Sequence, residues 1–322
     1  MDYRGPKLLA LICLGSVIGS AAAASGSKSL IRAMDWLAPD GYATALNSEP
    51  VTRLKMSGLN KKSIDKFIIG QTLFNTPTIL GGQAAKAGIS CASCHSNGRS
   101  NPYFQFPGVS GAPGTADVTH SFFSSFRGNA TFDPVTIPDL TKAGKISRNP
   151  ENDDLEKFVR DLIVEEFNGS EPSSASLTAL AHYIRTISPP RDEGAKMKWM
   201  ALGIEAHFDR AEEAFYSAEQ TLNAGDTNLA ILLFAGARHQ IGLVYERFQG
   251  SELTNEAQRL ENLGQKLGLI QTAIRNDNAK TTDLLRSWSD EFSRTKDLLD
   301  DKVELSLYNP DKLTAALGEE GL

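Results

Sequence analysis

Cysteine is scarce in this 322-residue chain, which contains Cys13, Cys91 and Cys94. Cys13 lies in an apolar stretch near the N-terminus, and the other two share one C-x-x-C motif. One close pair cannot form the set of disulfides that staples a small secreted domain. A structural zinc site needs about four ligands, and the sequence has no second cysteine pair to complete one. The scarcity therefore excludes a disulfide scaffold and directs attention to the one motif.

An excess of positive charge is also missing, because the formal net charge is −6 at pH 7. This excludes the basic footprint of a nucleic-acid-binding protein and favours a basic soluble partner. Proline-rich and serine-rich tracts are absent, and 41% of the residues are hydrophobic against 22% charged. These proportions are typical of a globular chain rather than a disordered one. The length favours two domains of ordinary size.

Residues 1–24 have the pattern of a secretory signal peptide. Arg4 and Lys7 form a short positive region, and an apolar stretch over 8–24 ends in small residues. The stretch is short and rich in Gly, Ser and Ala, so a membrane span is the weaker alternative. We therefore expect export to the periplasm.

The motif Cys91-Ala92-Ser93-Cys94-His95 predicts covalent attachment of one haem c. Two thiols at this spacing can each form a thioether to one porphyrin, and His95 then lies beneath the iron as the proximal ligand. Export agrees with this prediction, because c-type haem is attached outside the cytoplasm. A redox dithiol and a disulfide between Cys91 and Cys94 remain as alternatives.

The surroundings of the motif support a narrower comparison. A G-x-x-L-F segment at residues 70–74 comes about twenty residues before S-C-A-S-C-H at 90–95. With these features the chain resembles the bacterial di-haem cytochrome c peroxidase family, which includes methylamine-utilisation proteins that mature tryptophylquinone cofactors. The resemblance covers roughly residues 60–190 and implies a helical, cytochrome c-like haem domain. Three further segments are similar to family segments: 132–140, 154–160 and 177–184.

The chain departs from this family in two places. Family members that reduce peroxide usually carry two haem motifs, whereas this chain has one. Residues 142–150 stand where the family often has an aromatic-Met-His-Asp-Gly stretch, so the methionine ligand is missing there. The departures favour an electron-transfer cytochrome that serves a redox partner protein. The alternative is a mono-haem, peroxidase-like enzyme.

His120 is the first candidate for the sixth iron ligand. It follows His95 by 25 residues and precedes a segment, 127–130, that is similar to the distal-histidine segment of the family's peroxidatic half. An exposed loop histidine and an open sixth position are the alternatives. Other candidates are a histidine on an apolar helix face, which we expect to be a packed core residue, and two methionines near a domain junction: His182, Met197 and Met200.

A breaker at residues 188–194 precedes four segments whose apolar residues recur every three or four positions. These segments, 200–222, 229–248, 253–274 and 285–303, predict four amphipathic helices. Short connections favour an antiparallel helical bundle over 195–322, which we interpret as a docking or dimerising module. His207 and His239 are expected to be solvated or satisfied there. The predicted fold is all-α, with a cytochrome c-like haem domain over 25–188 followed by the bundle.

Overall fold

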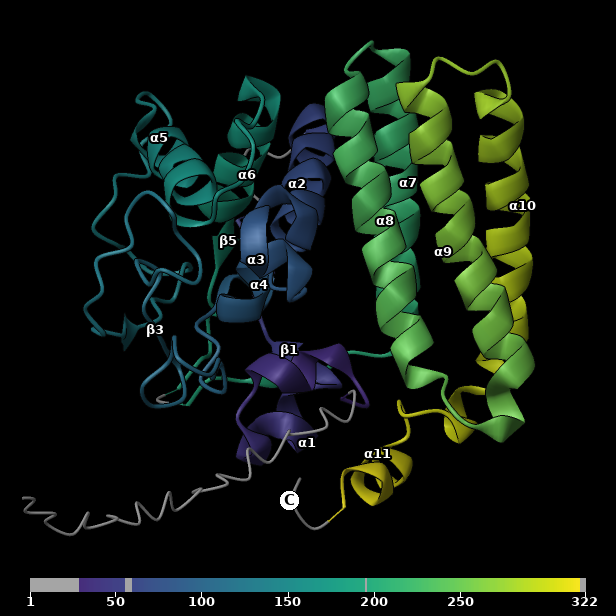
Figure 1. Ribbon diagram of the computed structural model, residues 1–322, viewed down its shortest axis with the longest axis horizontal. Coiled ribbons are helices and arrows are strands. Elements are labelled where there is room, and N and C mark those ends of the chain that lie inside the picture. The colour runs from purple at the N-terminus through teal and green to yellow at the C-terminus, as the bar shows by residue number, and fades with distance from the viewer. Residues whose placement is uncertain (1–28, 56–59, 195, 319–322) are drawn as a thin grey trace, which may run out of the picture.

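The computed structural model describes residues 29–55, 60–194 and 196–318. The chain is mostly helical, which confirms the all-α class (Figure 1). The predicted signal peptide, 1–24, lies outside the described residues. Within them, no helix is both long enough and apolar enough to cross a membrane.

The N-terminal half places short helices around a long, largely irregular segment, 99–153. Two longer helices, α2 and α6, pack against each other across this half. The helices of this half are η1 (Arg32–Trp36), η2 (Pro39–Gly41), α1 (Tyr42–Ala45), α2 (Lys61–Phe74), η3 (Pro77–Ile79), α3 (Gly82–Lys86), α4 (Cys91–Cys94), η4 (Ser96–Gly98), α5 (Asp154–Asp161), the π-helical turn η5 (Leu162–Glu166) and α6 (Ser174–Thr186).

Three short antiparallel strand pairs, which the sequence patterns did not predict, join distant segments. They are β1 (Ser48–Pro50) with β6 (Trp199–Ala201), β2 (Arg53–Leu54) with β5 (Ile187–Ser188), and β3 (Thr115–Ala116) with β4 (Val135–Thr136). The first two pairs flank the breaker predicted at 188–194. They therefore tie the segment after α6 to residues 48–54.

The crossing of α2 and α6 depends on a glycine. A Cβ atom on Gly70 would lie 2.1 Å from the carbonyl oxygen of Ala179, so the backbones touch where no larger residue fits. The ring of Tyr183 packs 5.3 Å from Phe67 and 4.9 Å from Phe74, measured between centroids. The Asn60 side chain accepts from the Ser63 amide and caps the start of α2. Local capping and one close contact thus fix the frame of this half.

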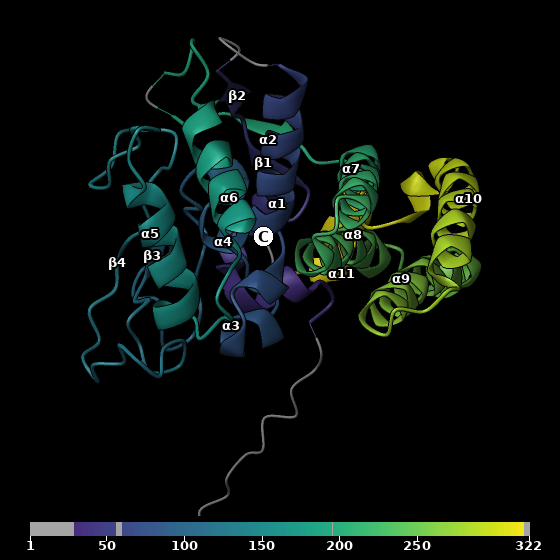
Figure 2. The same cartoon turned by 90° about the horizontal axis from the view of Figure 1, so that it is seen from above.

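The four periodic C-terminal segments form long helices near the predicted positions. They are α7 (Ile204–Asn223), α8 (Thr227–Arg247), α9 (Thr254–Arg275) and α10 (Thr281–Asp300), followed by α11 (Pro310–Leu317); η6 (Ser251–Leu253) and η7 (Val303–Leu305) are short turns. Each long helix packs against the one before it (Figure 2). Trp288 stacks on Phe215 and Phe292 with centroids 4.1 and 4.7 Å apart, which joins α10 to α7.

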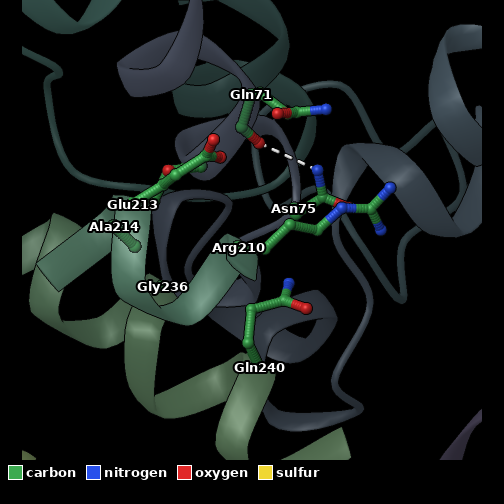
Figure 3. A pocket seen from close by; sticks show the side chains of 8 residues that line it. Gln71, Asn75, Arg210, Glu213, Ala214, Gly236 and Gln240 are labelled. Carbon is green, nitrogen blue, oxygen red and sulfur yellow. Dashed lines mark hydrogen bonds between the residues drawn. The ribbon is translucent and has the colours of Figure 1, made fainter. Parts of the chain in front are cut away.

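Helix α2 also lies against α7 and α8, so one buried apolar cluster runs through both halves (Figure 1). Gly236 permits this approach, because its Cβ would lie 2.5 Å from Cγ2 of Thr72. Beside the contact, Gln71 and Asn75 face Arg210 and polar groups of α7 and α8 (Figure 3). The cavity that they surround measures about 10 Å³, which is close to the space of one water molecule.

Candidate functional site

The two cysteines of the motif begin and end the one-turn helix α4. The Ser90 amide donates to Oγ of Ser93 over 3.1 Å, and the His95 amide donates to the Cys91 carbonyl over 2.9 Å. Residues three positions apart lie on one face of a helix, so both thiols leave α4 on the same side. Both thiols are free, with no disulfide between them. His95 follows at once, where the chain leaves helical geometry.

The His95 ring is oriented by the Pro138 carbonyl, 43 residues further along the chain. The distance from Nδ1 to the Pro138 oxygen is 3.0 Å. A carbonyl oxygen can only accept, so Nδ1 carries the proton and Nε2 keeps a lone pair. Burial lowers the pKa of His95 to about 4, although the hydrogen bond to Pro138 and the nearby Asp139 carboxylate both raise it. The imidazole is therefore neutral at pH 7, and Nε2 is available as a metal ligand.

The raised pKa values of the two thiols argue against a role as a redox dithiol or as a catalytic nucleophile. Burial raises the pKa of Cys91 to about 12, and burial with the neighbouring Cys91 raises the pKa of Cys94. Reactive cysteines instead have a lowered pKa, because the thiolate is the attacking species. Both thiols therefore stay protonated at pH 7, which disfavours the redox-dithiol alternative.

Arg99 braces the segment that supplies the Pro138 carbonyl. Its side chain is 1% exposed and donates from Nε to Asp139 over 2.9 Å and from Nη2 to Glu193 over 2.7 Å. Nη1 also donates to the Val51 carbonyl over 3.1 Å. Because Asp139 directly follows Pro138, the guanidinium holds that carbonyl in place above His95. No sequence pattern indicated this brace, whose one signal is a basic residue four positions after the motif.

The remaining walls close the motif from two sides. Phe74 lies 6.5 Å from the His95 ring between centroids and continues to Tyr183. On the other side the Asn101 amide donates to the Cys94 carbonyl, and its side chain donates to the Ser93 carbonyl. The α2–α6 crossing and the segment after η4 thus fix α4 between them.

The structure brings Cys91, Cys94 and His95 together, while the contacts of His120 lie within its own loop. Nδ1 of His120 accepts from the Phe122 amide over 3.1 Å. A neutral ring in this arrangement carries its proton on Nε2, the atom that a ligand to iron would need free. His120 as sixth ligand therefore stays a prediction, and this tautomer does not favour it.

Two of the other candidates are occupied elsewhere or turned outwards. Nε2 of His182 lies 3.0 Å from the Ser63 carbonyl, so this histidine ties α6 to α2. Met200 lies on β6 with 48% of its surface exposed. Across residues 29–55, 60–194 and 196–318, no three His, Cys, Asp or Glu side chains are grouped to hold a metal ion.

A haem attached through Cys91 and Cys94 needs two reduced thiols on one face and an imidazole with a nitrogen free to bind iron. The placement of Cys91 and Cys94, their free thiols and the orientation of the His95 ring meet this requirement. The donor set therefore fits haem c. The chain matches no protein-family model, no curated protein and no solved structure, so this interpretation rests on its own geometry.

Proposed function

We propose that this protein is an exported, periplasmic c-type cytochrome that holds one covalent haem at Cys91, Cys94 and His95. The observation that carries the proposal is the hydrogen bond from His95 Nδ1 to the Pro138 carbonyl. It leaves Nε2 free beside two protonated thiols on a single helical turn. Neither a dithiol nor a disulfide would require this orientation of the imidazole.

Each residue of the site has a distinct task in this proposal. Cys91 and Cys94 would bind the porphyrin as thioethers, and Nε2 of His95 would bind the iron. The bound iron supplies the chemistry, which is reversible uptake of one electron. The Pro138 carbonyl increases the basicity of the His95 ring and fixes its tautomer. Arg99 keeps that carbonyl in position by binding Asp139.

The favoured activity is electron transfer to or from a redox partner protein. The chain has one C-x-x-C-H motif, which accounts for one haem. Sharing of oxidising equivalents between two haems of one chain would need a second such motif. In this proposal the C-terminal helices α7–α10 form a bundle that docks the partner or a second copy. The resemblance of residues 60–190 to di-haem cytochrome c peroxidases agrees with a cytochrome c-like haem domain.

A second candidate is a peroxidase-like enzyme that reduces peroxide or oxidises a partner protein. The observation in its favour is the tautomer of His120, whose Nε2 carries a proton. Such a group donates a hydrogen bond to a small ligand instead of binding iron. This candidate requires an open or displaceable sixth position, whereas electron transfer requires a filled one.

The absorption spectrum of the exported ferric protein, with and without peroxide, separates the two candidates. We expect a low-spin haem spectrum that peroxide leaves unchanged. A high-spin spectrum that changes with peroxide would favour the enzyme, and a His120→Gln variant would then lose that response. A protein without haem absorption would contradict the proposal as a whole.

A further inference from the structure

A large cavity lies on the side of α4 that faces away from the thiols. It has a volume of about 850 Å³ and runs along α8, between that helix, the N-terminal half and α9. Ala92 and Ser93 of α4 line it, whereas Cys91, Cys94 and His95 do not. Its volume falls in the range of roughly 300–1,000 Å³ that is typical of small-molecule sites. It is therefore distinct from both the haem-attachment site and the water-sized cavity of Figure 3.

The charged side chains around this cavity carry an excess of positive charge. Four arginines line it against two glutamates: Arg32, Arg238, Arg247, Arg275, Glu246 and Glu261. Arg32 pairs with Glu246 at 3.3 Å, which neutralises one of the four. The cavity therefore offers a favourable electrostatic environment to an anion.

Arg247 is the strongest element of this environment. Its side chain is 3% exposed, and it donates from Nε to the Asn47 side chain over 2.7 Å. Its other bonds go to two backbone carbonyls, those of Leu243 and Leu46. Among the described residues, no carboxylate forms an ion pair with it. A buried charge without a counter-charge is costly, so an anion bound in the cavity would offset part of that cost.

The rest of the lining suits an aromatic body. The indole of Trp36 lines the cavity with a flat, largely apolar surface. His239 also lines the cavity. Apolar side chains complete the walls: Leu46, Pro77, Leu202, Ile241 and Leu260. Such a mixture of apolar surface and a few polar groups is typical of sites for small organic molecules.

We propose that this cavity binds an aromatic organic anion, with its negative group toward Arg247 and its rings along Trp36 and α8. The bound molecule would contact α4 directly behind the attached haem. This site goes beyond the proposed electron transfer and does not depend on it, because the argument uses neither cysteine of the motif.

Calorimetric titration of the exported holoprotein tests the site with two probes that share their rings. One is 8-anilinonaphthalene-1-sulfonate, an aromatic anion, and the other is N-phenyl-1-naphthylamine, which lacks the sulfonate. We expect saturable binding of the anion to one site, and at least about tenfold weaker binding of the neutral probe. Equal affinities, or no binding of the anion up to about 1 mM, would overturn the proposal.

Two glycine variants then place the binding. A Cβ on Gly242, which lines the cavity from α8, would meet no atom within 4 Å, so Gly242→Leu introduces a bulky side chain into the cavity from an open position. Gly194 has equally open surroundings outside the cavity, which makes Gly194→Leu the matched control. We expect Gly242→Leu to weaken binding of the anion at least about tenfold and Gly194→Leu to leave it unchanged. Unchanged binding in Gly242→Leu, with a native circular dichroism spectrum, would place the probe elsewhere and contradict the assignment.

Discussion

The two halves of the molecule each hold a neutral histidine, but by different means. In the N-terminal half, His95 donates to a backbone carbonyl delivered by a largely irregular segment that Arg99 braces. In the C-terminal half, Nδ1 of His207 lies 2.9 Å from the side-chain oxygen of Gln240 on the adjacent helix. Both arrangements leave Nε2 without a partner among the described residues.

The difference shows that the surroundings of an imidazole decide its use. His95 has two thiols beside it, whereas the ring of His207 packs 6.0 Å from that of Tyr308. The two halves also differ in what stabilises them. Polar side chains that bind backbone and carboxylates order the segment around His95, and stacked aromatic rings join the C-terminal helices. Substitutions should therefore act differently in the two halves.

The largest effect is expected from Trp288→Ala in the C-terminal half. Trp288 is 1% exposed, stacks between Phe215 and Phe292, and donates to the Leu263 carbonyl over 3.2 Å. Loss of a buried aromatic of this size costs about 3–5 kcal/mol of unfolding free energy. Urea unfolding followed by circular dichroism measures it, and the haem spectrum before unfolding should stay native. A loss of unfolding free energy below about 1 kcal/mol would show that the aromatic stack contributes little to the stability of this half.

An effect of comparable size but more local reach is expected from Arg99→Met. The substitution removes the charged hydrogen bonds to Asp139 and Glu193, which are worth about 1.5–3 kcal/mol each when made to charged groups. The segment that holds Pro138 should loosen, which would change the haem spectrum and the reduction potential as well as stability. Arg160→Met is the matched control, because Arg160 pairs with Glu171 at a more exposed site. Equal spectra and potentials in wild type and Arg99→Met would remove Arg99 from the account.

The same brace has a defined dependence on pH. Burial raises the pKa of Asp139, but hydrogen bonds from Thr141 and Arg99 outweigh that effect. The pKa of Asp139 is therefore lowered in the folded state. Its stabilisation is therefore present above the unfolded pKa of about 3.9 and is lost as the pH falls below it. Acid unfolding of wild type should show this loss in the haem spectrum, and Arg99→Met should shift it to higher pH. An unshifted acid transition in the variant would contradict the brace.

The helix crossing in the N-terminal half should be less tolerant than the junction between the halves. Gly70→Ala places a methyl group 2.1 Å from the Ala179 carbonyl, so α2 and α6 must move apart at a cost of about 1–3 kcal/mol. Gly236→Ala is the matched variant on α8, where the nearest atoms belong to the side chains of Thr72 and Thr76. Those side chains can move, so we expect a smaller loss in the unfolding free energy. A larger loss of unfolding free energy in Gly236→Ala than in Gly70→Ala would show that the junction between the halves is less tolerant than the α2–α6 crossing.

The smallest effect at pH 7 concerns His239, which lines the large cavity. Burial and the nearby Arg32 lower its pKa to about 4 in the folded state, against about 6.5 when unfolded. The unfolded chain therefore binds the extra proton between these values, and stability falls as the pH drops from about 6.5 toward 4. His239→Gln should reduce the slope of unfolding free energy against pH by up to about 1.4 kcal/mol per unit. An unchanged slope would show that His239 is not desolvated.

The sequence predicted the regular parts of the fold well, because they depend on local periodicity. The apolar repeats placed α7–α10, and Gly225-Asp226 and Asn276–Asn278 lie in the short connections between these helices. The short strand pairs were not predicted, since two or three residues carry no detectable alternation. Their partners lie more than a hundred residues apart in two of the three cases.

The sequence predicted the residues that would bind the haem, but not the residues that position them. Cys91, Cys94 and His95 are adjacent in sequence, so their spacing alone indicated haem attachment. The role of Pro138 rests on a backbone carbonyl, which every residue has and no motif can indicate. The pairing of Arg99 with Glu193 spans 94 positions and depends on the tertiary fold.

The most direct test of the account is the intact mass of the exported protein under denaturing conditions. We expect the polypeptide mass plus one haem for the wild type, and the bare polypeptide mass for a Cys91→Ser/Cys94→Ser double variant. A wild-type mass two hydrogens below that of the reduced polypeptide would reveal a disulfide between Cys91 and Cys94 and contradict the account.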